Sequence, residues 1–329
     1  MTDFTELIDL ASQALGGTVI TANDEFFAPK EALLKPTAAE WREGAYTERG
    51  KWMDGWETRR RRTPGHDWAL IHLGARGVVR GVVIDTSFFR GNYPERASIE
   101  GCDLAGTPSA AQLEHPSVAW RVLLNESSLS GDALNKFVVE EGLPVTHLRL
   151  NIFPDGGVAR LRAHGDVSPS LHGRTGLVDL AAVENGGYSV LCSDMFYGHR
   201  QNLIMPGRST FMGDGWETKR RRGPGHDWTI IKLGQRGVIE QIEVDTDHFK
   251  GNAPDSCMIE CANSPGASVE SLIDAKHPWT QILPSTKLQP HARHAFLAAA
   301  SPLATHARLN IYPDGGIARL RLFGRLPAT

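Results

Sequence analysis

The chain has 329 residues, a formal net charge of -3 and 41% hydrophobic residues. This length suggests about two domains, and the slightly negative charge excludes a protein held on nucleic acid by its overall charge. No stretch resembles an 18-residue apolar span, so a transmembrane helix is not expected.

The chain ends and the cysteines favour a cytoplasmic location. Residues 1–6 are acidic and lack the basic and apolar regions of a secretion signal, and the last residues are not a peroxisomal address. The four cysteines match no zinc pattern. We therefore expect reduced, mostly buried thiols at Cys102, Cys192, Cys257 and Cys261.

Taken in chain order, the pattern begins as a helix and then changes to strands. Thr5 to Leu15 places apolar residues on one helical face, and Gly16-Gly17 ends it. The segments that follow are short and rich in β-branched residues. Strands are predicted over residues 18–21, 68–73, 77–85, 97–100, 120–124, 147–153 and 158–163.

The last two predicted strands flank Pro154-Asp155-Gly156-Gly157, whose turn chemistry predicts a hairpin between them. Many short strands separated by Gly and Pro turns are typical of an antiparallel sandwich or jelly roll. Loops at one end of such a sandwich carry function while the strands hold them in place.

The chain contains an internal repeat. Residues 54–68 recur at 214–228 with thirteen of fifteen positions identical, and the matches extend to the helix and to the final strands. The offset falls from 170 to 160 because the first copy carries ten extra residues between Leu34 and Asp54. We predict two tandem all-β jelly-roll domains, each with a short N-terminal helix, over residues 1–163 and 176–329, joined by a linker over residues 164–175.

The central repeated stretch is unusually rich in charge. If Thr58 to Arg62 is extended, its arginines alternate between two faces, and an inward arginine needs an anion. That anion is either a neighbouring carboxylate (Asp54, Glu57 or Asp67) or the carboxylate of a ligand. His66 and Asp67 are adjacent in an extended segment and point to opposite faces, so they are not expected to act as a dyad.

Each of these patterns also has a structural interpretation. The arginine runs fit a solvated face or internal ion pairs, and His66 and His226 fit hydrogen-bonded structural roles. Asp85 and Asp245 end a strand and suit turn capping, and Asn92 and Asn252 suit left-handed turns. No spacing alone proves catalysis.

Three motifs resemble the allantoicase family. They are the stretch from Asp54 to Trp68, the run from Asp85 to Pro94, and the run from Asn151 to Arg160. All three recur in the second copy, and the resemblance covers nearly the whole chain. It implies two tandem jelly rolls of the galactose-binding-like type, and hydrolysis of allantoate to ureidoglycolate and urea in purine and allantoin breakdown. One departure is Asp247-His248-Phe249 where the first copy has Ser87-Phe88-Phe89.

Allantoate is a carboxylate with two ureido groups on one carbon. Its hydrolysis needs a proton for the leaving urea, a base for water and a cation for the carboxylate. The residues below are hypotheses for these roles, in both copies. The acid and base candidates are Asp54, Glu57, His66, Asp85, Glu100, Asp214, Glu217, His226, Asp245 and Glu260; the substrate-binding candidates are Arg60, Arg61, Arg62, Asn92, Asn151, Arg160, Arg220, Arg221, Arg222, Asn252, Asn310 and Arg319.

No cofactor is predicted. Histidines and carboxylates occur in each copy, but no helix-borne pair or compact ligand run indicates a metal; loss of activity on chelation would reverse that choice. The expected partner is the small molecule allantoate, with neither nucleic acid nor a membrane, and exposed sheet edges favour a homo-oligomer. The alternatives are a non-catalytic tandem carbohydrate-binding module and a nucleic-acid binder with strong salt dependence.

Overall fold

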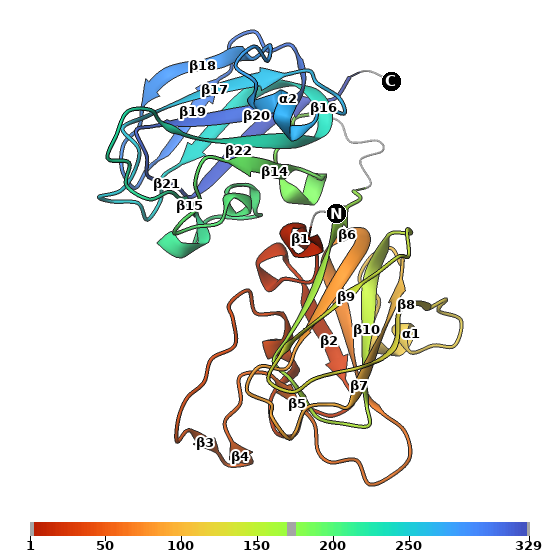
Figure 1. The fold of residues 1–329 in the computed structure, drawn as a ribbon. Helices are drawn as coiled ribbons and strands as arrows, with labels where there is room; N and C mark the ends of the chain where they lie inside the picture. Colours follow the sequence, from red (N-terminus) through yellow and green to blue (C-terminus); the bar gives the residue numbers. More distant parts are fainter. Residues whose placement is uncertain (1–2, 170–175, 328–329) are drawn as a thin grey trace. The chain divides into compact units, whose positions relative to one another are not determined.

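The structure is a computed structural model that describes residues 3–169 and 176–327. The chain divides into two compact units between Pro169 and Ser170, here called the first repeat and the second repeat, and each is described by itself (Figure 1). Of the predicted linker, residues 164–167 continue the last strand of the first repeat, and residues 170–175 lie outside the described residues.

The first repeat is built almost entirely of strands. Its only described α-helix is α1 (Ala110–Leu113), and 3-10 helices cover Phe4–Glu6, Gln13–Leu15 and Lys30–Leu34. Its strands are β1 (Ile8–Asp9), β2 (Thr18–Ala22), β3 (Tyr46–Thr47), β4 (Gly50–Lys51), β5 (Trp56–Glu57), β6 (Asp67–Asp85), β7 (Arg96–Cys102), β8 (Arg121–Ser128), β9 (Leu134–Val138), β10 (Val145–Phe153), β11 (Gly157–Val158) and β12 (Arg160–Val167).

The second repeat has the same plan without counterparts of β3 and β4 among its described residues. Its α-helix is α2 (Val269–Ile273), and 3-10 helices cover Val183–Asn185, Arg200–Ile204 and Met212–Asp214. Its strands are β13 (Val178–Asp179), β14 (Tyr188–Cys192), β15 (Trp216–Glu217), β16 (Asp227–Asp245), β17 (Ser256–Ala262), β18 (Thr280–Lys287), β19 (Arg293–Leu297), β20 (Leu303–Tyr312), β21 (Gly316–Ile317) and β22 (Arg319–Arg325).

Strand β6 organises the first repeat. Its N-terminal half pairs with β10 and β2, and its C-terminal half pairs with β12 and β9. The register shifts between His72 and Gly77, so one long strand serves both layers where the sequence predicted two. Side chains such as Leu70, Ile84, Leu150 and Leu161 are fully buried between the layers. The strand β16 is paired in the same way in the second repeat. The predicted all-β class with two tandem jelly-roll sandwiches is confirmed.

Two local predictions were wrong. Residues 5–15 do not form one helix, because Ile8–Asp9 pairs with β12 and the chain doubles back tightly at Gly17, where a Cβ would lie 1.9 Å from the Ala11 carbonyl oxygen. The apolar residues that suggested a helical face, Leu10 and Ala11, are buried between these turns.

The second error is the hairpin at residues 154–157. The flanking strands β10 and β12 pair with different halves of β6 and not with each other, while Gly157–Val158 pairs with β5. The turn therefore crosses between layers. Local turn chemistry cannot distinguish the two cases, because the same residues reverse the chain in both.

The cysteines are free thiols, with Cys102, Cys257 and Cys261 buried and Cys192 partly buried, as predicted. Burial raises the pKa of the Cys102 thiol to about 11 and that of Cys257 to about 12. Within the described residues, no helix is long and apolar enough to cross a membrane.

Candidate active site

The repeated stretch places Glu57 rigidly at one end of the first sandwich. Trp56 is fully buried, and its indole nitrogen donates to the Asp24 carbonyl oxygen at 2.8 Å. The Thr58 hydroxyl oxygen accepts from the Gly156 amide at 3.1 Å. Glu57 itself is in β5 and pairs with Gly157 of β11. The residue on each side of Glu57 is therefore anchored, which fixes the direction of its side chain.

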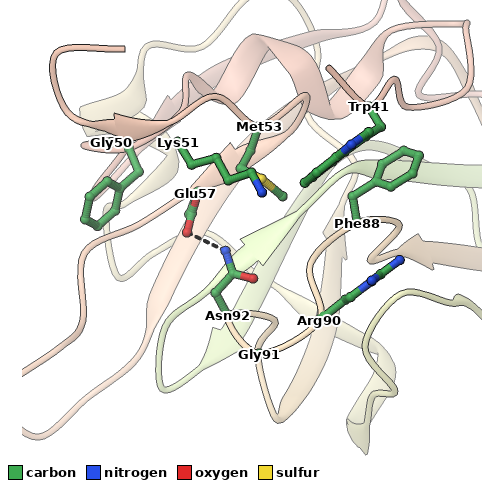
Figure 2. Close-up of a pocket in the computed structure, with 10 residues that line it drawn as sticks. Trp41, Gly50, Lys51, Met53, Glu57, Phe88, Arg90, Gly91 and Asn92 are labelled. Carbon is green, nitrogen blue, oxygen red and sulfur yellow. Dashed lines mark hydrogen bonds between the residues drawn. The ribbon is translucent and has the colours of Figure 1, made fainter. Parts of the chain in front are cut away.

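Glu57 faces a cavity of about 570 Å³ (Figure 2). The wall combines aromatic, cationic and amide groups, the usual composition of a small-molecule site. The lining residues are Phe27, Trp41, Gly50, Lys51, Met53, Glu57, Phe88, Arg90, Gly91 and Asn92.

The Glu57 carboxyl group has one hydrogen-bond partner in this cavity among the described residues. The Asn92 side-chain amide donates to Glu57 Oε1 at 2.7 Å. Burial raises the pKa of Glu57 above its usual range, and the Asn92 hydrogen bond opposes this only partly. A raised pKa favours the protonated carboxyl group, the form that a general acid needs.

Lys51 supplies a positive charge to the same cavity. Its ammonium nitrogen lies 4.1 Å from the centre of the Trp41 ring, a cation–π contact, and both residues project into the view of the cavity in Figure 2. Arg90 is also at the cavity, but its guanidinium pairs with Asp132 at 3.0 Å. Of the two cations, Lys51 is the one without a carboxylate partner among the described residues.

The ten extra residues of the first copy build this part of the wall. They lie in the segment between Leu34 and Asp54, which contains Trp41, the paired strands β3 and β4, and Lys51. Sequence reasoning located this excess but proposed none of Trp41, Lys51, Met53, Phe88 or Arg90 as site residues. The ten-residue excess could have indicated these residues. An insertion that precedes a repeated loop in only one copy must lie on the surface beside that loop.

The arginine run is not a strand, since β5 ends at Glu57. Arg61 forms an ion pair with Asp67 at 2.6 Å, one of the carboxylates expected for it, and its backbone amide donates to Asp155. Arg60 and Arg62 line a neighbouring cavity of about 890 Å³ that shares Glu57 and Asn92 with the first.

Asp54 and Arg160 are joined to each other, and neither lines the Glu57 cavity, its neighbour or the His66 cavity. The two form a buried ion pair at 2.5 Å, and Lys35 contacts Asp54 at 2.7 Å. Burial alone would raise the pKa of Asp54, but hydrogen bonds from Arg160 and Lys35 hold it below its usual range. Arg160 also donates to the carbonyl oxygens of Thr37 and Ala38. This pair holds the start of the insertion against the sandwich.

Asp85 caps the turn after β6. It is buried, and its carboxylate accepts from the Ser87 amide at 2.7 Å. This is the turn-capping role that the sequence also allowed.

His66, Glu100 and Asn151 gather at a different place. His66 and Asn151 line a separate cavity of about 410 Å³ together with Arg61 and Arg149. The Asn151 amide donates to Glu100 at 3.1 Å, and the His66 ring packs against Phe153 with centroids 4.7 Å apart. The structure thus divides the predicted residues between a Glu57–Asn92 group and a His66–Asn151–Glu100 group.

The second repeat reproduces both groups. Asn252 donates to Glu217 at 2.6 Å, and Asn310 contacts both Glu260 and His226 at 3.0 Å. The remaining predicted residues also keep their positions. Arg221 pairs with Asp227, and Arg220 and Arg222 are exposed. Arg319 donates to the Asp214 carbonyl oxygen at 2.7 Å, and Asp245 accepts from the Asp247 amide at 2.8 Å.

The chain is a duplicated β-sandwich with a carboxyl–amide pair and a cation in a cavity at its loop end. This combination defines a class of proteins that act on small polar molecules. Comparison with known proteins narrows that class. The model of the allantoicase repeat matches residues 8–168 and 178–327. The chain belongs to the allantoicase family.

Individual relatives agree over the full length. A probable allantoicase of Pseudomonas aeruginosa strain LESB58 is 49% identical and one of Photobacterium profundum is 46% identical, each over 98% of this chain and 97% of the relative. Among solved structures, the allantoicase of Saccharomyces cerevisiae is 35% identical with a TM-score of 0.81, over 97% of this chain and 93% of that one. These matches favour the hydrolase over the carbohydrate-binding alternative.

Proposed function

We propose that this chain hydrolyses allantoate to ureidoglycolate and urea in the Glu57 cavity of the first repeat. The activity follows from membership of the allantoicase family. The observation that carries the location is the partly buried Glu57 carboxyl group, which shares one cavity with an amide donor and a cation.

The reaction breaks the bond between the central carbon and one ureido nitrogen and forms a bond from that carbon to the water oxygen. One proton must leave the water and one must reach the departing nitrogen. Glu57 is proposed for both proton transfers: it donates one proton to the leaving urea nitrogen and accepts one from water. Its raised pKa supports this role, because it favours the neutral acid over the ionised form.

Substrate orientation is assigned to the groups around Glu57. Lys51 takes the carboxylate, since its charge is uncompensated by any carboxylate among the described residues. Asn92 has an amide oxygen and a second N–H for the ureido groups, which offer both donors and acceptors. Arg60 and Arg62 line the adjoining cavity that Glu57 also borders and form the alternative carboxylate site.

The His66–Asn151–Glu100 group is the competing location. It also combines an acid-base residue, an amide and the cation Arg149. The Glu57 cavity is preferred because Arg149 is already engaged, pairing with Glu100 at 3.5 Å and lying 4.5 Å from the centre of the Trp120 ring.

The direct test mixes the purified chain with allantoate and follows both products by NMR, with and without a chelator. Urea and ureidoglycolate released in equal amounts are expected. Saturable binding of allantoate without turnover would mean that the site binds but does not catalyse, and absence of both would overturn the proposal.

We also propose that the chain self-associates in the cytoplasm. Support comes from exposed apolar side chains on the second repeat, at Met195, Phe196, Tyr197, Phe211 and Met212, since apolar surface of this kind marks interaction sites. The free cysteines fit a reducing compartment. Light scattering should give a mass above 36.0 kDa, and Phe196→Ser with Phe211→Ser should lower it; a monomer in the wild type would contradict the proposal.

A further inference from the structure

The second repeat holds a cluster of ligating side chains that the proposed function does not use. Asp247 and His248 follow β16, and His291 precedes β19. One potential ligand atom from each lies within 4.8 Å of the other two. His291 Nδ1 is 2.7 Å from Asp247 Oδ1, and His248 Nε2 is 3.8 Å from Asp247 Oδ2.

The first repeat shows that these histidines are not needed to build the turn. Their counterparts are Phe88 and Asp132, and the backbone is the same, with φ of 68° and 50° there against 69° and 52° at His248 and His291. Asp132 accepts from the Phe88 amide at 2.8 Å, and His291 accepts from the His248 amide at the same distance. His291 thus takes over the turn contact made by Asp132, whereas the first repeat builds the same turn without an imidazole at the Phe88 position.

The surroundings suit a bound cation. The Ser209 carbonyl oxygen is 3.1 Å from His248 Nε2, the nitrogen that also faces Asp247, so a backbone oxygen atom lies beside the potential ligand atoms. Asp247 and His248 are partly buried and His291 is exposed, so solvent reaches the cluster. Arg208 competes for Asp247 as an exposed side chain 3.0 Å from its Oδ2 atom, and exposed pairs of this kind are weak.

We propose that Asp247, His248 and His291 bind one divalent transition-metal ion of the zinc, cobalt or nickel type. Two imidazoles and one carboxylate suit these ions and not magnesium or calcium, which prefer oxygen ligands. Water completes the coordination. The inference goes beyond the proposed function and does not depend on it, because the first repeat lacks both imidazoles.

The test is zinc titration of the full chain by calorimetry after dialysis against a chelator. One ion per chain is expected. The double variant His248→Phe with His291→Asp carries the residues of the first repeat, which fit the same backbone, and should weaken binding at least about tenfold. Arg208→Ala removes the competing cation and should tighten binding. His115→Ala, a histidine in the first repeat, is the control and should change nothing.

Two outcomes would overturn the proposal. One is the absence of saturable zinc binding to the wild type, and the other is binding that survives unchanged in the double variant. Should the double variant fail to fold, Asp247→Asn decides the question, because it keeps the shape and removes only the anionic ligand; unchanged zinc affinity in that variant would equally overturn the proposal. Activity on allantoate is not the readout, so failure here leaves the hydrolase proposal intact.

Discussion

The two repeats share one scaffold but finish their loop ends differently. Both hold the carboxyl–amide pair, as Glu57–Asn92 in the first and Glu217–Asn252 in the second. The first repeat adds the insertion that brings Trp41 and Lys51 to the cavity, whereas the second has a short 3-10 helix, Met212–Asp214, in its place.

The insertion also changes what is exposed. The aromatic pair Phe26–Phe27 is 39% and 37% exposed, and Arg49 of the insertion lies 5.2 Å from the Phe26 ring centre. The equivalent pair Phe196–Tyr197 is 68% and 63% exposed. The motif is therefore duplicated, but the residues around it are not. We assign catalysis to the first repeat and other roles to the second repeat.

The largest expected effect is on stability. Asp54→Ala leaves Arg160 as a buried charge without its carboxylate and should cost about 3–5 kcal/mol. Asp214→Ala should cost clearly less, because the Asp214 side chain is 27% exposed, against 5% for Asp54, and lies 3.8 Å from Arg319. Urea unfolding of both variants measures the difference, and equal losses would show that the repeats depend equally on this pair.

The next effect concerns turnover. Glu57→Gln should lower kcat about 10²-fold or more because the proton donor is removed, while Glu217→Gln should leave kcat almost unchanged. NMR assay of urea release compares the two. The assignment to the first repeat fails if Glu217→Gln is the more damaging change. Near wild-type rates in a chain lacking Glu57, His66, Glu217 and His226 together would reject all four as catalytic groups.

Lys51→Met should act on binding more than on chemistry. Loss of a charged hydrogen bond to the substrate carboxylate corresponds to about 10- to 100-fold in KM, with kcat little changed. Steady-state kinetics separates the two constants. Lys219→Met, an exposed lysine of the second repeat, is the control, and equal behaviour of the two variants would remove Lys51 from the site.

The smallest effect is a pH dependence of stability. Because burial raises the pKa of Glu57 in the folded chain, the folded state holds this proton at pH values where the unfolded state has lost it. Its contribution is therefore lost as pH rises from the usual carboxyl range to the raised pKa. Glu57→Gln should abolish that decline, as judged from urea midpoints of the variant and the wild type across the range from the usual carboxyl pKa to neutral pH.

Two buried histidines also make stability depend on pH in this measurement of urea midpoints. Burial lowers the pKa of His147 and His306 to about 4, so both repeats lose stability as pH falls from the usual histidine range towards that value. This loss is common to the wild type and the variant and cancels in the difference. A difference that does not vary with pH would contradict the raised pKa of Glu57.

Much of this could be predicted from sequence. The repeat follows from identity between the copies, and the fold class from short strands separated by turn residues. The cost of burying an unpaired charge predicted an anion for an arginine of the run, but the sequence left three carboxylates and a ligand open, and only the structure pairs Arg61 with Asp67. The helix at residues 5–15 could not be rejected, because its apolar spacing also fits two turns around a short strand. The hairpin could not be rejected either, because strand pairing is decided by layers distant in sequence.

The division of the candidate residues into two groups was also beyond the sequence. Asn92 is 35 residues from Glu57, while Asn151 is 51 residues from Glu100 and shares a cavity with His66. Only the strand register decides which of them meet. The ten-residue excess was visible, but the position of Lys51 on the cavity wall depends on the β3–β4 pairing.

The most direct test of the assignment to the first repeat is a crystal structure of the Glu57→Gln variant soaked with allantoate. We predict allantoate in the first repeat, with its carboxylate at Lys51 and a ureido group at Asn92, and an empty Glu217–Asn252 position in the second. Allantoate bound beside His66 and Asn151, or at Glu217, would contradict that assignment.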